Sequence, residues 1–349
     1  MSVFSRSGGE AIAIHVGASR WLLIDSLNSE HGRPITLEYL EQIGVDPACV
    51  EGILLTHWHD DHIEGAAKLV RSCLNAKVAI PATLKRDEFA GFMDVIEPSG
   101  ATSFGSGVAE LIDVLKVVLD ERGDHPRWGI AQRTLFSGNL PSYALEALSP
   151  SDADMTNFVA SLKGWVEAVV PGGRIPAPPR NDASVAAVVS VLDERLLFGA
   201  DLEVSKPDSG WHAVQTYSWN GRPKASFLKV PHHGSKNADF PAMWADMVVP
   251  NVYAALTPWN KNKKLPQDTD VNRIVARTNN AFSASKAVQR KAMRRMSTVD
   301  GMLRDAGIVL TRAPTDVGFV RFRKQLLSIE DWAVECLGVG SYKLEKIAA

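Results

Sequence analysis

The residue types best suited to metal binding are concentrated in one short segment, residues 56–62, which reads THWHDDH. His57 and His59 are two residues apart, so on an extended chain their side chains point to the same side. Asp61 and His62 open the helix that follows and point to a second position nearby. Imidazole and carboxylate groups together suit Zn²⁺, with Mn²⁺ or Fe²⁺ as alternatives. The segment therefore predicts a site for divalent ions rather than a chance cluster of surface side chains.

Two later segments bring further ligand types to the ends of apolar runs. The run 196–200 is followed by Asp201, a single carboxylate that could bridge two cations. The run 228–230 is followed by a proline and then by His232 and His233. We expect His233 to be the ligand and His232 to face the substrate or transfer a proton, although the two could exchange roles.

Apolar strands are predicted directly before each of these groups. The chain alternates strands and helices twice, which is typical of sheets covered by helices, and sites in such folds lie beyond the strand ends. The expected strands that matter for the site are Glu10–Val16, Arg20–Ile24, Glu51–Leu55, Ser184–Leu192, Arg195–Gly199, Ala225–Val230 and Val252–Leu256. The expected helices are Pro34–Gly44, Ile63–Leu74, Leu84–Ile96, Val108–Asp120 and Asp152–Val169, with a helical region from Val271.

Two stretches carry no clear pattern. Residues 121–138 are expected to be irregular. Residues 328–349 show no periodicity that identifies an element, and a terminal helix used for packing or for dimerisation is one interpretation. The oligomeric state and any partner protein are left open.

Bulk properties exclude several classes of protein. The chain has 349 residues, a net charge of −2 and three cysteines without a CxxC pair, so metal binding by cysteines is not expected. We find neither a leader-like amino terminus nor an apolar stretch long enough for a membrane span. These features predict a cytoplasmic protein with no membrane partner.

Charge is segregated towards the carboxyl end. Residues 261–324 contain fifteen Lys and Arg against five Asp, a difference of +10 in a chain of net −2. Such a run is either a solvated helical face or a surface that follows phosphates. We therefore divide the chain into a hydrolase-like unit, residues 1–260, and a basic carboxyl-terminal region, residues 261–349, that completes or extends it.

The order and spacing of these motifs resemble the metallo-β-lactamase superfamily. The resemblance rests on Asp25 after an apolar run, the His57–His62 segment, Ala200-Asp201 and the PHHGS turn at 231–235. GEAI at 9–12, ALSP at 147–150, NDAS at 181–184 and KVPHHGS at 229–235 are similar to the hydrolase domain of competence-type DNA-uptake channel proteins. Cell-wall phosphorylcholine esterases are more distant. The resemblance covers about residues 9–257, and the membrane helices of the channel proteins are missing.

This resemblance implies a four-layer αβ/βα sandwich with the site at one edge. It implies His57 and His59 on one ion and Asp61, His62 and His233 on the other. Asp201 would lie between the two ions, and Asp25 would fix the ligand loop from behind. Many members supply a further histidine to the first ion, where this chain offers only Asn181 and Asp182.

The function predicted from these residues is metal-dependent hydrolysis by a hydroxide held on two divalent ions. A phosphodiesterase or nuclease is favoured, with Asp61 holding a proton and His232 protonating the leaving group. The candidate residues for contact with substrate are Ser235, Trp259, Lys261, Lys263 and Lys264. One alternative is a hydrolase of carboxylic esters, thioesters or lactones. Another is an interaction protein with a vestigial metal site.

Overall fold

The computed structural model contains two sheets of eight strands each. It describes residues 1–6, 8–85, 106–167, 181, 183–260, 264–286, 302 and 318–347. The first sheet has the order β15 (Ala333–Leu337), β14 (Gly318–Arg323), β1 (Ser2–Arg6), β2 (Gly9–Gly17), β3 (Arg20–Ile24), β4 (Val50–Leu54), β5 (Lys77–Pro81) and β6 (Arg127–Gly129). The second has the order β16 (Tyr342–Lys343), β13 (Ala281–Ser283), β12 (Val248–Leu256), β11 (Ala225–Lys229), β10 (Glu194–Phe198), β9 (Ala187–Val191), β8 (Ser142–Ala147) and β7 (Arg133–Asn139).

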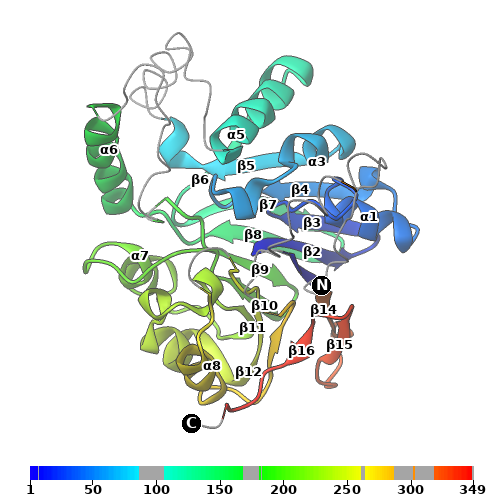
Figure 1. Ribbon diagram of the computed structural model, residues 1–349, viewed down its shortest axis with the longest axis vertical. Coiled ribbons are helices and arrows are strands. Elements are labelled where there is room, and N and C mark those ends of the chain that lie inside the picture. The colour runs from blue at the N-terminus through cyan, green and yellow to red at the C-terminus, as the bar shows by residue number, and fades with distance from the viewer. Residues whose placement is uncertain are drawn as a thin grey trace.

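Helices cover the outer face of each sheet, and the two sheets pack on one another between them (Figure 1). The helices α1, α3 and α5 lie against the first sheet, and α7 and α8 lie against the second. The bounds of the α-helices are α1 (Ile35–Gln42), α2 (Asp60–Ile63), α3 (Ala66–Ser72), α5 (Ser106–Lys116), α6 (Asp152–Glu167), α7 (Gly210–Ala213) and α8 (Asp268–Val275). This is the predicted αβ/βα sandwich.

Alternation along the strands explains the layers, because successive side chains of a strand point to opposite faces. In β2, Ile12 and Ile14 face the second sheet, whereas Ala11 and Ala13 face the helices. In β11, Phe227 points inward and Leu228 points to the outer helices. Both faces of each central strand are buried, so the strands appear in the sequence as nearly continuous apolar runs.

The parallel parts of the two sheets determine where the site lies. Strand β3 pairs in parallel with β4, and β4 with β5, while β10, β11, β12 and β13 pair in parallel in the second sheet. Parallel strands place their carboxyl ends at one edge of the sheet. The residues that follow β3, β4, β10, β11 and β12 therefore meet at one edge of the sandwich.

One prediction from the sequence was wrong, and one interpretation that the sequence left open is contradicted. Residues 121–138 are not irregular throughout, because they contain β6 and most of β7. No helix lies among the described residues after 328, since this part forms β15 and β16. Both concern strands at or near sheet edges, where exposed positions interrupt the apolar pattern.

Residues 264–347 contribute strands to both sheets. Strand β14 pairs with β1 in the first sheet, and β13 pairs with β12 in the second. Among the described helices, none is both long enough and apolar enough to span a lipid bilayer.

Candidate metal centre

The predicted ligands come from three segments at the shared edge, each of which follows a strand. His57 and His59 lie between β4 and α2, and Asp61 and His62 lie in the first turn of α2. Asp201 follows β10, and the pair 232–233 follows β11. A Cβ atom at Gly199 would overlap the ring of Pro231, so only glycine permits the ends of β10 and β11 to approach this closely. The close approach brings Asp201 to the His232-His233 turn.

Asp61, His62, Asp201 and His233 form one buried group of ligand atoms. The Nε2 atom of His233 lies 3.1 Å from Oδ2 of Asp61 and 3.6 Å from Oδ2 of Asp201. The Nε2 atom of His62 lies 3.4 Å from Oδ2 of Asp61 and 3.3 Å from Oδ1 of Asp201. Two atoms bound tetrahedrally to one Zn²⁺ at about 2.0–2.2 Å are about 3.3–3.6 Å apart. These separations fit a single ion.

His57, His59 and Asp201 form a second group, which shares the carboxylate of Asp201 with the first. The Nε2 atom of His57 lies 3.9 Å from Oδ2 of Asp201. His57 is buried, whereas His59 is partly exposed. The structure thus brings six predicted ligands together in two groups joined by one aspartate.

Unpaired buried atoms support the fit to a cation. Among the described residues, Nε2 of His57, Nε2 of His62 and Oδ1 of Asp201 are buried without a hydrogen-bond partner. A buried polar atom without a partner is costly, and native proteins rarely contain one without a reason. Three such atoms in one place, all of types that coordinate Zn²⁺, fit a divalent ion.

The other ring nitrogen of each buried histidine is occupied by a protein group. Nδ1 of His62 lies 2.7 Å from Oδ2 of Asp25, and Nδ1 of His233 lies 2.8 Å from the carbonyl oxygen of Thr257. The single hydroxyl proton of Thr56 goes to Asp25, so this hydroxyl accepts from Nδ1 of His57 at 3.0 Å. Each ring therefore presents Nε2 to the centre, as a metal ligand must.

The electrostatic surroundings of the ligand groups favour the binding of a positively charged ion. Burial alone would raise the pKa of Asp61 and of Asp201, but nearby histidines hold both pKa values well below the ordinary range. Burial would lower the pKa of His62, but Asp201, Asp61 and Asp25 raise this pKa well above its ordinary value. Two ionised carboxylates thus face the centre at neutral pH.

Backbone strain is concentrated at the same edge. Asp25, Ala200, His232 and His233 all have left-handed backbone angles, with φ of 60°, 44°, 44° and 54°. Residues other than glycine rarely adopt this region, and strained backbone of this kind clusters at functional sites. The strain at 232–233 lets two adjacent histidines point to different partners.

His232 lies beside the centre but in a more open position than His233. The side chain of His232 is 18% exposed, and its Nδ1 atom lies 3.2 Å from Oε1 of Glu203. Its Nε2 atom lies 3.8 Å from Oδ2 of Asp201. Burial lowers the pKa of His232, but Glu203 and Asp201 outweigh it and the net pKa is raised.

Asn181 lies next to His232 and Glu203. Its Nδ2 atom donates to Oε1 of Glu203 at 3.2 Å, and its buried Oδ1 atom has no partner among the described residues. Nε2 of His232, which lies 3.8 Å from Oδ2 of Asp201, is a described atom that could add a ligand to the group of His57 and His59. Asp182 lies outside the described residues.

The structure describes three of the five residues that were predicted to contact substrate. The ring of Trp259 packs against His233, with centroids 5.6 Å apart, and Ser235 follows the histidine turn. Lys264 is described and partly exposed, whereas Lys261 and Lys263 lie outside the described residues.

Sequence reasoning missed three residues that shape the site. Glu203 has a detectable signal, because it is two residues beyond Asp201 and two-residue spacing on extended chain shares a side. Thr257 had no local signal, because it acts through its carbonyl oxygen. Asp60 is not among the grouped ligand atoms, and its carboxylate instead accepts from the backbone N–H of Gly107 at the start of α5.

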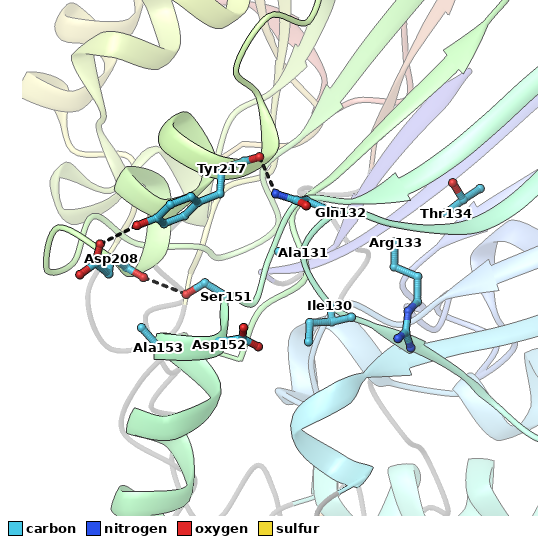
Figure 2. Close-up of a pocket in the computed structure, with 10 residues that line it drawn as sticks. All are labelled: Ile130, Ala131, Gln132, Arg133, Thr134, Ser151, Asp152, Ala153, Asp208 and Tyr217. Atoms are coloured by element: carbon cyan, nitrogen blue, oxygen red, sulfur yellow. Dashed lines mark hydrogen bonds between the residues drawn. The ribbon is translucent and has the colours of Figure 1, made fainter.

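A separate cavity of about 840 Å³ opens beside the connection before β7 and the start of α6 (Figure 2). Tyr217 donates to a carboxylate oxygen of Asp208, and Ser151 donates to the carbonyl oxygen of Asp208. None of the predicted ligands lines this cavity. The predicted chemistry therefore belongs to the strand-end edge and not to this cavity.

Comparison with known families decides the classification of this arrangement. The metallo-β-lactamase superfamily model matches residues 9–240. The chain belongs to this superfamily. Its fold and its His and Asp groups are those of a metal-dependent hydrolase.

The matches among solved structures have low sequence identity and low TM-scores. A metallo-β-lactamase-like protein from Thermotoga maritima is 14% identical, with a TM-score of 0.30, and the match covers 57% of this chain and 68% of that one. The metallo-β-lactamase fold protein YhfI from Bacillus subtilis is 10% identical, with a TM-score of 0.35, and the match covers 65% and 68%. No curated protein sequence matches the chain significantly.

Proposed function

We propose that this protein is a dinuclear metal-dependent phosphodiesterase and that nucleic acid, or another phosphodiester, is its substrate. The observation that carries the proposal is the carboxylate of Asp201, which belongs to both groups of ligand atoms. Two divalent ions, Zn²⁺ first and Mn²⁺ or Fe²⁺ as alternatives, would activate water and stabilise the charge that develops on the phosphoryl oxygens.

Charge balance supports two ions rather than one. Asp25, Asp61 and Asp201 are buried at the centre, while the buried Glu10 is paired with Lys229. One divalent ion would leave an excess of negative charge on the three aspartates. Two ions reverse the sign, so the pair of ions attracts an anionic group such as a phosphodiester.

The protein groups would divide the remaining work. Asp61 would orient the attacking water and hold its proton, because its carboxylate faces the centre. His232 would donate a proton to the leaving oxygen, and Glu203 would orient its ring. Trp259 and Lys264 would contact the leaving nucleotide, and the same role for Lys261 and Lys263 stays a prediction from the sequence. The resemblance to the hydrolase domain of DNA-uptake proteins supports the same substrate class.

A hydrolase of carboxylic esters, thioesters or lactones is the second candidate, and one observation favours it. Of the seven described Lys and Arg residues in 261–324, four make ion pairs with acidic residues. These four are Arg273, Arg321, Arg323 and Lys324. Their charge is therefore partly neutralised and less available to a phosphate backbone.

The deciding experiment is hydrolysis of bis(p-nitrophenyl) phosphate by purified protein loaded with Zn²⁺ or Mn²⁺. We expect turnover in the parent protein and loss of about 100-fold or more in Asp61→Asn. Asp60→Asn is the matched control, because Asp60 is the adjacent aspartate and an asparagine oxygen can still accept from Gly107. Full activity is expected in this control.

Other outcomes separate the alternatives. Turnover of p-nitrophenyl butyrate without turnover of the phosphodiester would favour the ester hydrolase. A parent protein that binds no divalent ion would favour the interaction protein with a vestigial site.

A further inference from the structure

A buried ion pair joins the two sheets directly behind the metal centre. The side chains of Glu10 in β2 and Lys229 in β11 are 1% and 0% exposed, and Nζ of Lys229 lies 2.6 Å from Oε2 of Glu10. Period-two alternation places Glu10 on the inner face with Ile12, and Lys229 on the inner face with Phe227. Two charges thus occupy positions that continue the apolar core between the sheets.

Contacts lead from this pair to both buried histidines of the four-residue group. The hydroxyl of Thr257 donates to Oε2 of Glu10 at 2.7 Å, while the carbonyl oxygen of the same threonine accepts from Nδ1 of His233. On the other side, ligand-type atoms of Glu10, Asp25 and His62 all lie within 4.8 Å of one another. The ion pair is therefore one residue away from each histidine.

The lysine explains why two carboxylates can lie together here. Glu10 and Asp25 are both fully buried, and two uncompensated carboxylates at this separation would repel each other. The ammonium group of Lys229 supplies the positive charge, and it also donates to the carbonyl oxygen of Val230, just before the Pro231-His232-His233 turn. Asp25 can then accept from His62 while Glu10 accepts from Thr257.

We propose that Glu10 and Lys229 are positioning residues for the metal site formed by Asp61, His62, Asp201 and His233. The inference rests on the proposed function only in that the site holds a divalent ion. Through its contacts with Glu10 and the carbonyl oxygen of Val230, Lys229 keeps Asp25 and Thr257 in the places from which they orient His62 and His233. A pair that merely fastened the two sheets would influence the stability of the fold but not the affinity of the folded protein for metal.

The test compares Lys229→Met with the double variant Glu10→Gln, Lys229→Met. The single variant leaves the charge of Glu10 buried and unpaired next to Asp25. The double variant removes both charges and retains an oxygen that can accept from Thr257. Lys324→Met is the matched control. It breaks the ion pair between Lys324 and Glu194, which lies at the start of β10, whereas the ligand Asp201 follows the end of that strand.

Three quantities are measured on each protein: Zn²⁺ affinity by competition with a chromophoric chelator, the visible spectrum of the Co²⁺-loaded form, and the urea midpoint. We expect Lys229→Met to bind Zn²⁺ about 10–100-fold more weakly, with an altered Co²⁺ spectrum, as for other groups that orient ligands. The double variant should recover part of this affinity but still bind more weakly than the parent, because it lacks the ammonium group that donates to the carbonyl oxygen of Val230. Lys324→Met should bind as the parent does. Comparison at a urea concentration where each protein is folded separates binding from stability.

The outcomes distinguish this inference from the proposed function. Unchanged Zn²⁺ affinity and an unchanged Co²⁺ spectrum in folded Lys229→Met would overturn the positioning role while leaving the metal centre intact. If Lys229→Met does not fold, weak Zn²⁺ binding and an altered spectrum in the folded double variant would support the role, and parent-like values would overturn it. A parent protein that binds neither ion would overturn both proposals.

Discussion

At this site, adjacent residues of the same type have different surroundings. These surroundings decide what each residue can do chemically. Asp60 caps α5, whereas the next residue, Asp61, faces the metal groups. His233 is buried against Asp61, whereas His232 faces Glu203 and is partly exposed. The left-handed backbone at both histidines produces this divergence, because it turns consecutive side chains towards different elements.

The contrast predicts different defects in the two histidine variants. His232→Gln should retain the parent metal content and lose about 100-fold in turnover of an oligonucleotide, since general acid catalysis contributes about 10²–10⁴-fold. The same variant should lose much less on bis(p-nitrophenyl) phosphate, because p-nitrophenolate leaves readily without a proton. The measurement is turnover of both substrates, with metal content determined by mass spectrometry.

His233→Gln is the comparison, and it should bind less metal and lose turnover of both substrates equally. Loss of metal from His232→Gln would contradict the assignment, because it would make His232 a ligand of the ion at His57 and His59. Equal losses on the two substrates would also argue against proton donation by His232.

At the scale of elements, the carboxyl-terminal strands complete the hydrophobic core. Phe322 in β14 is fully buried between the sheets and contacts the rings of Phe227 and Phe282, at centroid distances of 5.0 and 5.7 Å. Phe322→Ala should therefore lower the free energy of unfolding by about 3–5 kcal/mol. Urea denaturation followed by circular dichroism measures this loss.

Leu327→Ala serves as the control for that variant, because Leu327 lies in the same hairpin and is 82% exposed. Its change in stability should stay within about 0.5 kcal/mol. A small effect of Phe322→Ala, similar to that of the control, would show that β14 adds little to the core.

The strands that precede the ligands could be predicted because both of their faces are buried. Residues 52–55 are continuously apolar, and only Ser226 and Lys229 interrupt the apolar residues of 225–230, which is close to the pattern of central parallel strands. Strand β15 could not be predicted, because it is an edge strand whose residues are all at least partly exposed. This strand is held in the sheet by pairing with β14, and the residues of β15 alone do not indicate that pairing.

The grouping of the candidate ligands was predictable for a related reason. The spacing alone indicates one binding site, because four of the candidate ligands are so close in sequence: His57, His59, Asp61 and His62. The ion pair of Glu10 and Lys229 had no such signal, since its partners belong to different sheets and meet only in the folded chain. The three-dimensional structure was needed to connect these two charges with the histidines.

At the scale of the whole molecule, the metal centre connects the two halves of the sandwich. His57, Asp61 and His62 follow a strand of the first sheet, whereas Asp201 and His233 follow strands of the second. The core between the sheets is also shared, with Ile12 and Phe227 in the same cluster of buried side chains. An ion bound by both halves would therefore stabilise the folded chain as one unit.

This arrangement predicts that metal raises the stability of the entire chain in a single transition. Zn²⁺ at about 100 times its dissociation constant should add about 2.7 kcal/mol to the free energy of unfolding. The measurement is urea denaturation with Zn²⁺ and with a chelator, followed by both tryptophan fluorescence and circular dichroism. Asp201→Asn should largely abolish the effect, because this variant removes the carboxylate that both groups share. Two separate transitions in the metal-free protein, or an unshifted midpoint with Zn²⁺, would contradict a centre that joins the two halves.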